Sequence, residues 1–246
     1  MSKRTIDINC DVGEGVGNES DLFALISSCN IACGGHAGSI ETMRLCINFA
    51  KQFHVKIGAH PSFPDKPNFG RVEMTISAAD LYASLKQQIR TLQNVLYAEK
   101  VQLRHIKPHG ALYNLISVDE NAAKCFIEAI KKYSENVFLY VPYNSVIEKE
   151  ALKNNINIKY EAFADRSYNN DLTLVSRSFS NAVITSPNLV LEQISTLVLE
   201  GKVNTVSHLE KELKANTFCI HGDNSNSLEI LKYLKTELPK KGITIG

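Results

Sequence analysis

The sequence alternates seven short segments rich in β-branched residues with longer segments of helical period, and this alternation strongly limits the possible folds. The expected strands are 5–10, 29–33, 55–59, 103–107, 137–141, 158–162 and 217–221. The expected helices are 40–53, 78–98, 119–133, 145–153, 187–200 and 226–237. Strands that alternate with helices are typical of a parallel sheet. Because no Pro- or Gly-rich linker divides the chain, we expect a single α/β domain over residues 1–246.

Three serines support the helix boundaries, because each precedes an acidic residue by three positions. Ser77, Ser117 and Ser145 stand in this relation to Asp80, Glu120 and Glu148. In such a capping box the hydroxyl and the carboxylate satisfy free backbone N–H groups of the first turn. The pattern predicts helix starts at these three places.

Reactive side chains fall where the expected strands end. They are Asn9, Asp11 and Glu14 after the first strand, His36 after the second, His60 after the third, Lys107 and His109 after the fourth, Asp165 and Arg166 after the sixth, and His221 and Asp223 after the seventh. Active sites of α/β barrels lie at the C-terminal ends of the strands. The sequence therefore predicts seven strands around one polar pocket.

Charge and cysteine content limit the partners and the compartment. The 27 basic and 26 acidic residues give a net charge of +1, without a long run of one sign, so nucleic acid is not an expected partner. The sequence has neither 18 consecutive apolar residues nor a signal peptide, so we expect no membrane association. Six cysteines without a signal are typical of reduced thiols in the cytoplasm.

The glycine-rich segment 9–17 allows two interpretations. It matches neither G-x-G-x-x-G nor the P-loop pattern, so it is weak support for a nucleotide site. It is either a tight turn that needs positive φ, or a loop that presents Asp11 as a general base and Glu14 as an orienting carboxylate. His36, among three glycines before a helix, likewise belongs either to a flexible turn or to an anion site.

The remaining motifs suggest acid–base and charge-binding roles. His60 is followed by a stiff Pro-containing turn, and Arg71 offers a guanidinium for a carboxylate or a phosphate. His105 and His109 have H-x-x-x-H spacing, but on an extended strand their rings would stand about 13 Å apart. We therefore favour Lys107 as a charge donor and His109 as an acid–base group over a metal pair.

The last two motifs each pair a charged residue with a neighbour in sequence. Asp165 beside Arg166 is either a solvated surface pair or part of the pocket. Asp223 either orients the ring of His221 or joins it as a metal ligand.

Seven segments together resemble the LamB/YcsF family. They are 7–14, 30–38, 57–61, 69–71, 107–114, 161–168 and 221–223, in the family's order, and they cover about residues 6–224. The resemblance implies a TIM-like (β/α)7 barrel of the glycoside hydrolase/deacetylase type. It also implies the A subunit of an ATP-dependent 5-oxoprolinase, which acts with B and C subunits to convert 5-oxo-L-proline to L-glutamate, with ATP and Mg²⁺ as co-substrate.

Within this interpretation we assign two groups of roles. The expected catalytic residues are Asp11, His60, Lys107 and His109. The expected substrate-binding residues are Asn9, Glu14, His36, Arg71, Asp165, Arg166, His221 and Asp223. The chain has no P-loop, so phosphorylation of the lactam is expected in the partner subunits.

Whether the pocket binds a metal stays open at this stage, and two other functions remain. One is a stand-alone metal-dependent deacetylase or hydrolase, in which Asp11, His60 and His109, or His36 with His221, bind Zn²⁺ and activate water. The other is a binding barrel or regulatory subunit without chemistry of its own.

Overall fold

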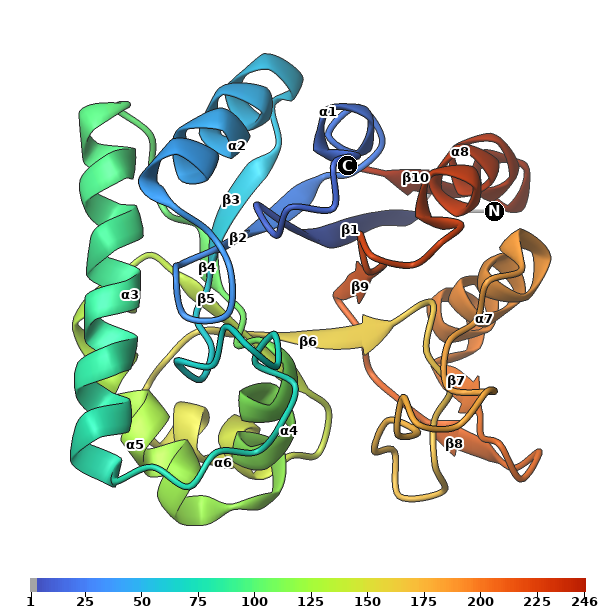
Figure 1. Cartoon of the computed structure of the whole chain (residues 1–246). Helices are drawn as coiled ribbons and strands as arrows, with labels where there is room; N and C mark the ends of the chain where they lie inside the picture. The colour runs from blue at the N-terminus through green and yellow to red at the C-terminus, as the bar shows by residue number, and fades with distance from the viewer. Residues whose placement is uncertain (1–3) are drawn as a thin grey trace.

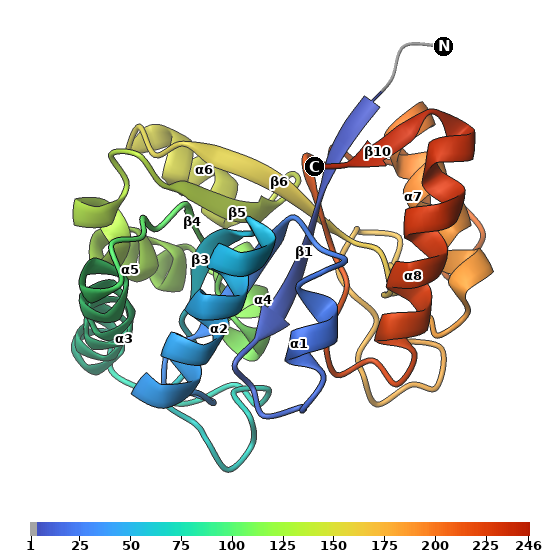
Figure 2. The same ribbon diagram turned by 90° about the horizontal axis from the view of Figure 1, so that it is seen from above.

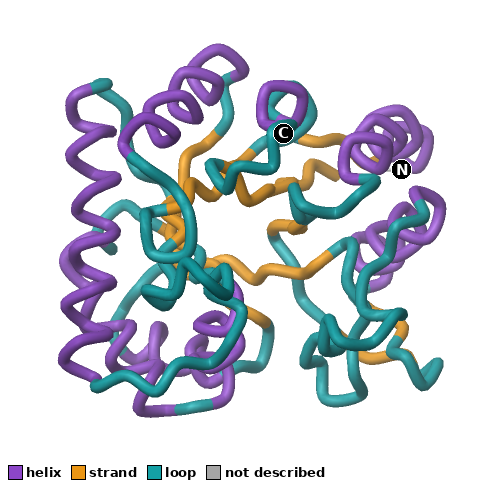
Figure 3. The backbone as a smooth tube through the Cα atoms, viewed as in Figure 1, coloured by secondary structure: helices purple, strands orange, loops and turns teal. Residues whose placement is uncertain are grey.

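The computed structural model describes residues 4–246 and contains a closed barrel of parallel strands. The barrel strands are β1 Arg4–Val12, β2 Ser28–Ala32, β3 Lys56–His60, β4 His105–Ile106, β5 Phe138–Pro142, β6 Ile158–Phe163 and β9 Thr217–Cys219. They pair in that order, and β1 closes the ring by pairing with β9, so that Asn9 lies opposite Cys219. Figure 3 shows these strands as an inner ring with helices outside. The predicted (β/α)7 barrel is confirmed.

Helices surround the ring. They are α1 Glu19–Leu22, α2 Ile40–Phe53, α3 Ala78–Ala98, α4 Gly110–Val118, α5 Glu120–Ile130, α6 Val146–Lys153, α7 Pro187–Glu200 and α8 Ser227–Glu237, with 3-10 turns η1 Lys131–Tyr133 and η2 Leu238–Lys241. Viewed from above, α7 and α8 lie together on one side, with α2, α3 and α5 on the other (Figure 2). Strand β10 Ile243–Ile245 extends the sheet beside the start of β1. Strands β7 Lys202–Asn204 and β8 Glu210–Glu212 form a separate antiparallel pair.

The sequence of β1 shows why the inside of the barrel is polar. Ile6, Ile8, Cys10 and Val12 belong to the hydrophobic core. The intervening residues at 7, 9 and 11 are polar and also buried, and their side chains bond to residues of other barrel strands. Because side chains alternate along a strand, one face packs on the helices while the other presents polar groups to the interior.

The sequence interpretation was wrong around the fourth strand. The strand expected at 103–107 is present, but its regular pairing covers only His105–Ile106 and ends before Pro108, which has no N–H for the ladder. The next helix, α4, was not predicted at all. Ser117 lies inside α4 and donates to the carbonyl of Tyr113, so it does not cap the following helix. Asp119 caps α5 by accepting from the N–H of Ala122. The caps at Ser77 and Ser145 are confirmed.

Among residues 4–246, no helix has the length and apolar character needed to cross a bilayer.

Candidate active site

Polar side chains fill the inside of the barrel. The layer toward the N-terminal ends of the strands contains the carboxylate of Asp7, which lies opposite Thr217 at the start of β9. This carboxylate accepts hydrogen bonds from the hydroxyls of Ser28 and Thr217, each at 2.6 Å. Burial alone would raise the pKa of Asp7, but these hydrogen bonds and nearby positive charge lower it below its usual range. This end of the interior is closed by a satisfied hydrogen-bond network.

Two buried amides form the next layer. Asn30 donates to Asn9 Oδ1 at 2.7 Å and to Asp11 Oδ1 at 2.8 Å. Asn9 in turn donates to Glu161 Oε1 at 3.0 Å. His105 Nε2 lies 2.7 Å from Asn30 Oδ1, so this ring donates there and carries its proton on Nε2. Through Asn30, this layer fixes the position of the Asp11 carboxylate.

Lys107 is a buried cation among acidic groups. Its Nζ lies 2.9 Å from Asp11 Oδ1, 3.2 Å from Glu161 Oε1 and 2.9 Å from Cys219 Sγ. Burial favours the neutral amine, but the carboxylates outweigh it and hold the pKa of Lys107 well above its ordinary value. Burial likewise raises the pKa of Asp11, but His60 and Lys107 outweigh it and the net pKa is well below the usual range. The pair is therefore ionised, and Cys219, whose pKa burial raises, remains a thiol.

Three histidines and one glutamate meet above this pair, at the carboxyl ends of the strands. Glu14 Oε1 lies 2.8 Å from His36 Nε2, 3.8 Å from His60 Nε2 and 3.4 Å from His109 Nδ1. His60 Nε2 and His109 Nδ1 are 2.9 Å apart. The rings of His36 and His109 are stacked, with centroids 3.7 Å apart. We call Glu14, His36, His60 and His109 the histidine cluster.

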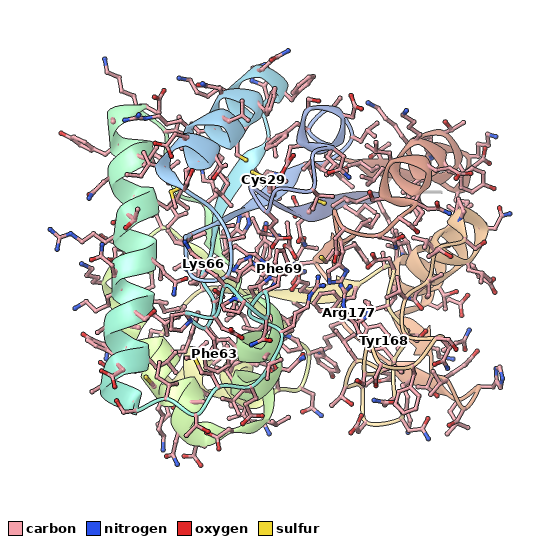
Figure 4. All side chains as sticks on the ribbon, in the orientation of Figure 1. Cys29, Phe63, Lys66, Phe69, Tyr168 and Arg177 are labelled. Atoms are coloured by element: carbon pink, nitrogen blue, oxygen red, sulfur yellow. The ribbon has the colours of Figure 1, made fainter. Side chains whose placement is uncertain are left out.

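The cluster comes from four neighbouring strand ends: Glu14 follows β1, His36 follows β2, His60 ends β3 and His109 follows β4. The loops after β2 and β3 pass in front of the barrel in Figure 1. Gly70 has a φ of +62° and lies between two of the rings. A Cβ there would stand 2.9 Å from His36 Cβ and 3.1 Å from His109 Cδ2, so only glycine fits. Phe69, labelled in front of the barrel in Figure 4, accepts from His109 through its backbone carbonyl.

His221 forms a dyad with a buried aspartate. Its Nδ1 lies 2.8 Å from Asp165 Oδ1, and its backbone N–H donates to Asp165 Oδ2. Asn224 donates to the same carboxylate at 3.0 Å. Burial would raise the pKa of Asp165, but His221 and these hydrogen bonds lower it. The ring therefore carries its proton on Nδ1, and its Nε2 makes no hydrogen bond to residues 4–246.

Asp223 does not orient His221, contrary to one of the interpretations from sequence. It pairs with Arg71 at 2.5 Å and with Arg177 at 3.4 Å, which links the loops after β3, β6 and β9. Arg166 is buried and donates to the carbonyls of Ala182 and Val175. Its guanidinium thus holds the 167–184 segment, and its expected contact with substrate stays an untested prediction.

Most of the predicted residues lie together at one end of the barrel. They are Asn9, Asp11, Glu14, His36, His60, Lys107, His109, Asp165 and His221, with Arg71 and Asp223 at the rim. Sequence reasoning assigned no role to Asn30, Glu161 or Cys219, although all three contact the central pair or its neighbours. For Asn30 and Glu161, the available signal in the sequence was a polar residue with apolar neighbours inside an expected strand.

Within residues 4–246, two groups of side chains have the donor atoms for a metal ion. One is the histidine cluster, and the other consists of Asp11, Cys219 and His221; in each group one potential ligand atom per residue lies within 4.8 Å of the others. The second group contains a neutral, buried thiol beside an ammonium, which disfavours a cation there. The histidine cluster is the better candidate.

Comparison with known proteins decides the family, since the model of the LamB/YcsF family matches residues 6–246. The chain belongs to the LamB/YcsF family. Among LamB/YcsF relatives, the A subunit of 5-oxoprolinase from Campylobacter jejuni subsp. jejuni (strain 81-176) is 39% identical over 98% of this chain and 96% of its own length. That of Haemophilus influenzae (strain PittEE) is 38% identical over 98% and 99%.

Two solved structures share the fold of this chain. The lactam utilization protein from Thermus thermophilus has a TM-score of 0.90 and 36% identity, and the match covers 98% of each chain. A family 4 carbohydrate esterase from Streptomyces lividans matches with a TM-score of 0.52 and 9% identity, which indicates a shared barrel fold alone.

Proposed function

We propose that this chain is the A subunit of an ATP-dependent 5-oxoprolinase, which opens 5-oxo-L-proline to L-glutamate together with B and C subunits. Relatives with that name match along nearly their whole length. The single observation that carries the proposal is the ionised Asp11–Lys107 pair at the end of a polar barrel, with the Asp165–His221 dyad beside it. This set offers a carboxylate, a cation and an oriented base at one end of the barrel.

The chemistry explains why ATP is needed. A five-membered lactam is stabilised by amide resonance, and phosphorylation of its oxygen makes the ring carbon electrophilic. Addition of water to that carbon and cleavage of its C–N bond, with protonation of the nitrogen, open the ring to an acyl phosphate. A second water then releases phosphate and L-glutamate. In this proposal the partner subunits perform the phosphorylation, and this chain performs the ring opening.

His221 is the best-placed base for the first water. Its Nδ1–H donates to Asp165, which leaves Nε2 as an acceptor that can take a proton and later return it to the leaving nitrogen. The buried Asp165 stabilises the imidazolium that forms, as in other Asp–His pairs. Sequence reasoning assigned this base to Asp11 or His109. In His109, Nε2 donates to the carbonyl of Phe69, and Nδ1 lies only 2.9 Å from His60 Nε2, which leaves no room for a water between them.

Lys107 and Asp11 supply fixed charge to the pocket. The ammonium of Lys107 favours negative charge that develops on the lactam or phosphate oxygen, and a preorganised donor of this kind contributes roughly 10²–10³-fold to the rate. Asp11, held by Lys107 and Asn30, favours the cationic ring nitrogen. Arg71 at the rim offers a bidentate donor for the carboxylate of 5-oxoproline, in exchange with Asp223.

The test is glutamate release from 5-oxo-L-proline with ATP and Mg²⁺, for the chain alone and with its B and C subunits. We expect turnover only in the complex, and its loss in Asp11→Asn and His221→Gln. His208→Asn serves as the control, because this histidine is exposed and lies in the turn between β7 and β8. Normal turnover in either site variant contradicts the role given to that residue.

The alternative of a stand-alone metal-dependent hydrolase is tested in a separate assay. Hydrolysis of an amide or acetyl ester by the isolated chain, without ATP and without partner subunits, would replace the proposal. Ligand binding without turnover in the full complex would favour a binding or regulatory role instead.

A further inference from the structure

The histidine cluster contains two rings whose tautomers are fixed by the backbone. His60 Nδ1 lies 2.7 Å from the carbonyl oxygen of Lys107, and His109 Nε2 lies 2.9 Å from that of Phe69. A carbonyl oxygen only accepts, so each of these nitrogens carries a hydrogen. In the neutral rings the other nitrogens, His60 Nε2 and His109 Nδ1, therefore carry lone pairs.

These two lone pairs face each other at 2.9 Å. Two carboxylate oxygens border the same point, since His60 Nε2 lies 3.3 Å from Asp11 Oδ2 and 3.8 Å from Glu14 Oε1. All of these groups are buried or nearly so. Acceptor atoms that converge in this way without a hydrogen between them repel one another, so the arrangement calls for a cation at their centre.

We propose that Glu14, His60 and His109 bind one divalent transition-metal ion, with Zn²⁺ as the best match. His60 Nε2 lies 2.9 Å from His109 Nδ1 and 3.8 Å from Glu14 Oε1, and His109 Nδ1 lies 3.4 Å from Glu14 Oε1. Ligands at 2.0–2.1 Å in tetrahedral geometry stand ~3.4 Å from one another. The rings of His60 and His109 are nearly perpendicular, at 88°, so both lone pairs can point at one ion.

The surroundings support a metal site in a second way. Histidines that bind a metal almost always donate their other N–H to a carbonyl or a carboxylate, and both rings do so here. A site with two histidines and one glutamate leaves the fourth position open for water or substrate. The proposed ion therefore lies at the end of the barrel that holds the Asp11–Lys107 pair.

His36 supports this site without being one of its ligands. Its ring is stacked on His109 with only 2° between the planes, so one ion cannot lie in both ring planes. Its Nε2 is 2.8 Å from Glu14 Oε1, where it donates and fixes the carboxylate. This inference is independent of the proposed function, because it rests on donor geometry and its test measures binding.

The first experiment is metal analysis of the full chain, stripped with a chelator, incubated with one to two equivalents of Zn²⁺ and desalted. We expect about one Zn²⁺ per chain, and at least a tenfold lower content in His60→Gln and in His109→Gln. The matched control His208→Asn removes an exposed histidine and should keep the full content. Wild-type chain that retains no more zinc than the two site variants would overturn the proposal.

A second measurement does not depend on how the variants fold. Co²⁺ added to the stripped wild-type chain should produce the visible absorption of a four- or five-coordinate site, and Zn²⁺ should abolish it. The rival arrangement is a doubly protonated His60 that donates to His109. If ¹⁵N resonances of zinc-treated chain show protons on both nitrogens of His60, the metal site is excluded.

Discussion

Nζ of Lys107 lies 2.9 Å from Oδ1 of Asp11 in the interior of the barrel, and the Lys107 side chain is only 2% exposed. Desolvation of both charges is costly, and the attraction between them offsets that cost only where further hydrogen bonds complete the site. Asn30, Asn9 and Glu161 supply those bonds. The relationship between these two residues therefore governs both the stability of the protein and the charge inside this end of the barrel.

Replacement of Lys107 by methionine should be strongly destabilising. The variant leaves Asp11 and Glu161 as buried carboxylates without their cation, and breaking a buried pair in this way typically costs about 3–5 kcal/mol. The free energy of unfolding in urea measures the loss. Lys202→Met is the matched control, because it breaks an exposed pair with Glu210 worth roughly 0–1 kcal/mol. Equal losses of unfolding free energy in both variants would show that the buried pair stabilises the protein no more than the exposed pair does.

Asp165→Asn should leave the barrel folded but impair catalysis. The amide can still accept from the backbone N–H of His221, yet its NH₂ group opposes the ring N–H and favours the wrong tautomer. We expect kcat of the complete enzyme to fall by roughly 10²-fold or more, as for loss of an acid–base group. Asp171→Asn, in the exposed turn that contacts Thr173, is the control. Unchanged kcat would remove His221 from the role of base.

The periodicity of the sequence predicted the barrel because local pattern and final fold agree there. The segment from Ile6 to Val12 alternates apolar and polar residues, as a strand does, and closure of the barrel buries the polar face as well as the apolar one. The pattern failed where signals overlapped. Ser117 and Glu120 have capping-box spacing, but Asp119 between them caps the helix, so α4 was missed.

The sequence predicted where most side chains of the candidate site lie, but it did not predict which of them pair. The expected strand ends identified most of the side chains that lie together, since the C-terminal ends of parallel strands meet at one end of a barrel. Which side chains pair depends on how the strands and their loops come together in the closed barrel. Neighbouring residues in the sequence carry no information about this. His221 pairs with Asp165, 56 residues away, and Asp223 with Arg71, 152 residues away. Glu161 was missed because its role depends on Asn9, also 152 residues distant.

Arg71 should control affinity for the substrate more than turnover. In the structure its guanidinium binds Asp223 at the rim, and the proposed function has it exchange this partner for the carboxylate of 5-oxoproline. We expect Arg71→Ala to raise KM about tenfold or more, with a smaller change in kcat. Asp223→Asn frees Arg71 and should leave KM equal or lower. Arg44→Ala, at an exposed position of α2, is the control. A KM unchanged in Arg71→Ala would place the carboxylate elsewhere.

His105 should make the protein less stable in mild acid. Burial lowers the pKa of this ring from 6.5 to about 3, and the ring stacks on Tyr140 with centroids 4.1 Å apart. Between pH 6.5 and 3 the unfolded chain therefore holds a proton on His105 that the folded chain does not. The free energy of unfolding thus falls as the pH falls through this window, by about 2 kcal/mol from pH 6.5 to 5 for this group alone.

His105→Gln tests this dependence, because the amide can still donate to Asn30 but does not titrate. The variant is expected to be less stable than wild type at pH 7, and its unfolding free energy should change less between pH 7 and 5. Urea denaturation at several pH values gives the two slopes. His208→Asn should keep the wild-type slope, since this side chain is exposed. The carboxylates of Asp7, Asp11 and Asp165 have pKa values below the usual range, so in the folded protein they titrate below the window from pH 7 to 5. Parallel slopes for wild type and His105→Gln would mean that His105 is not the group that destabilises the fold in acid.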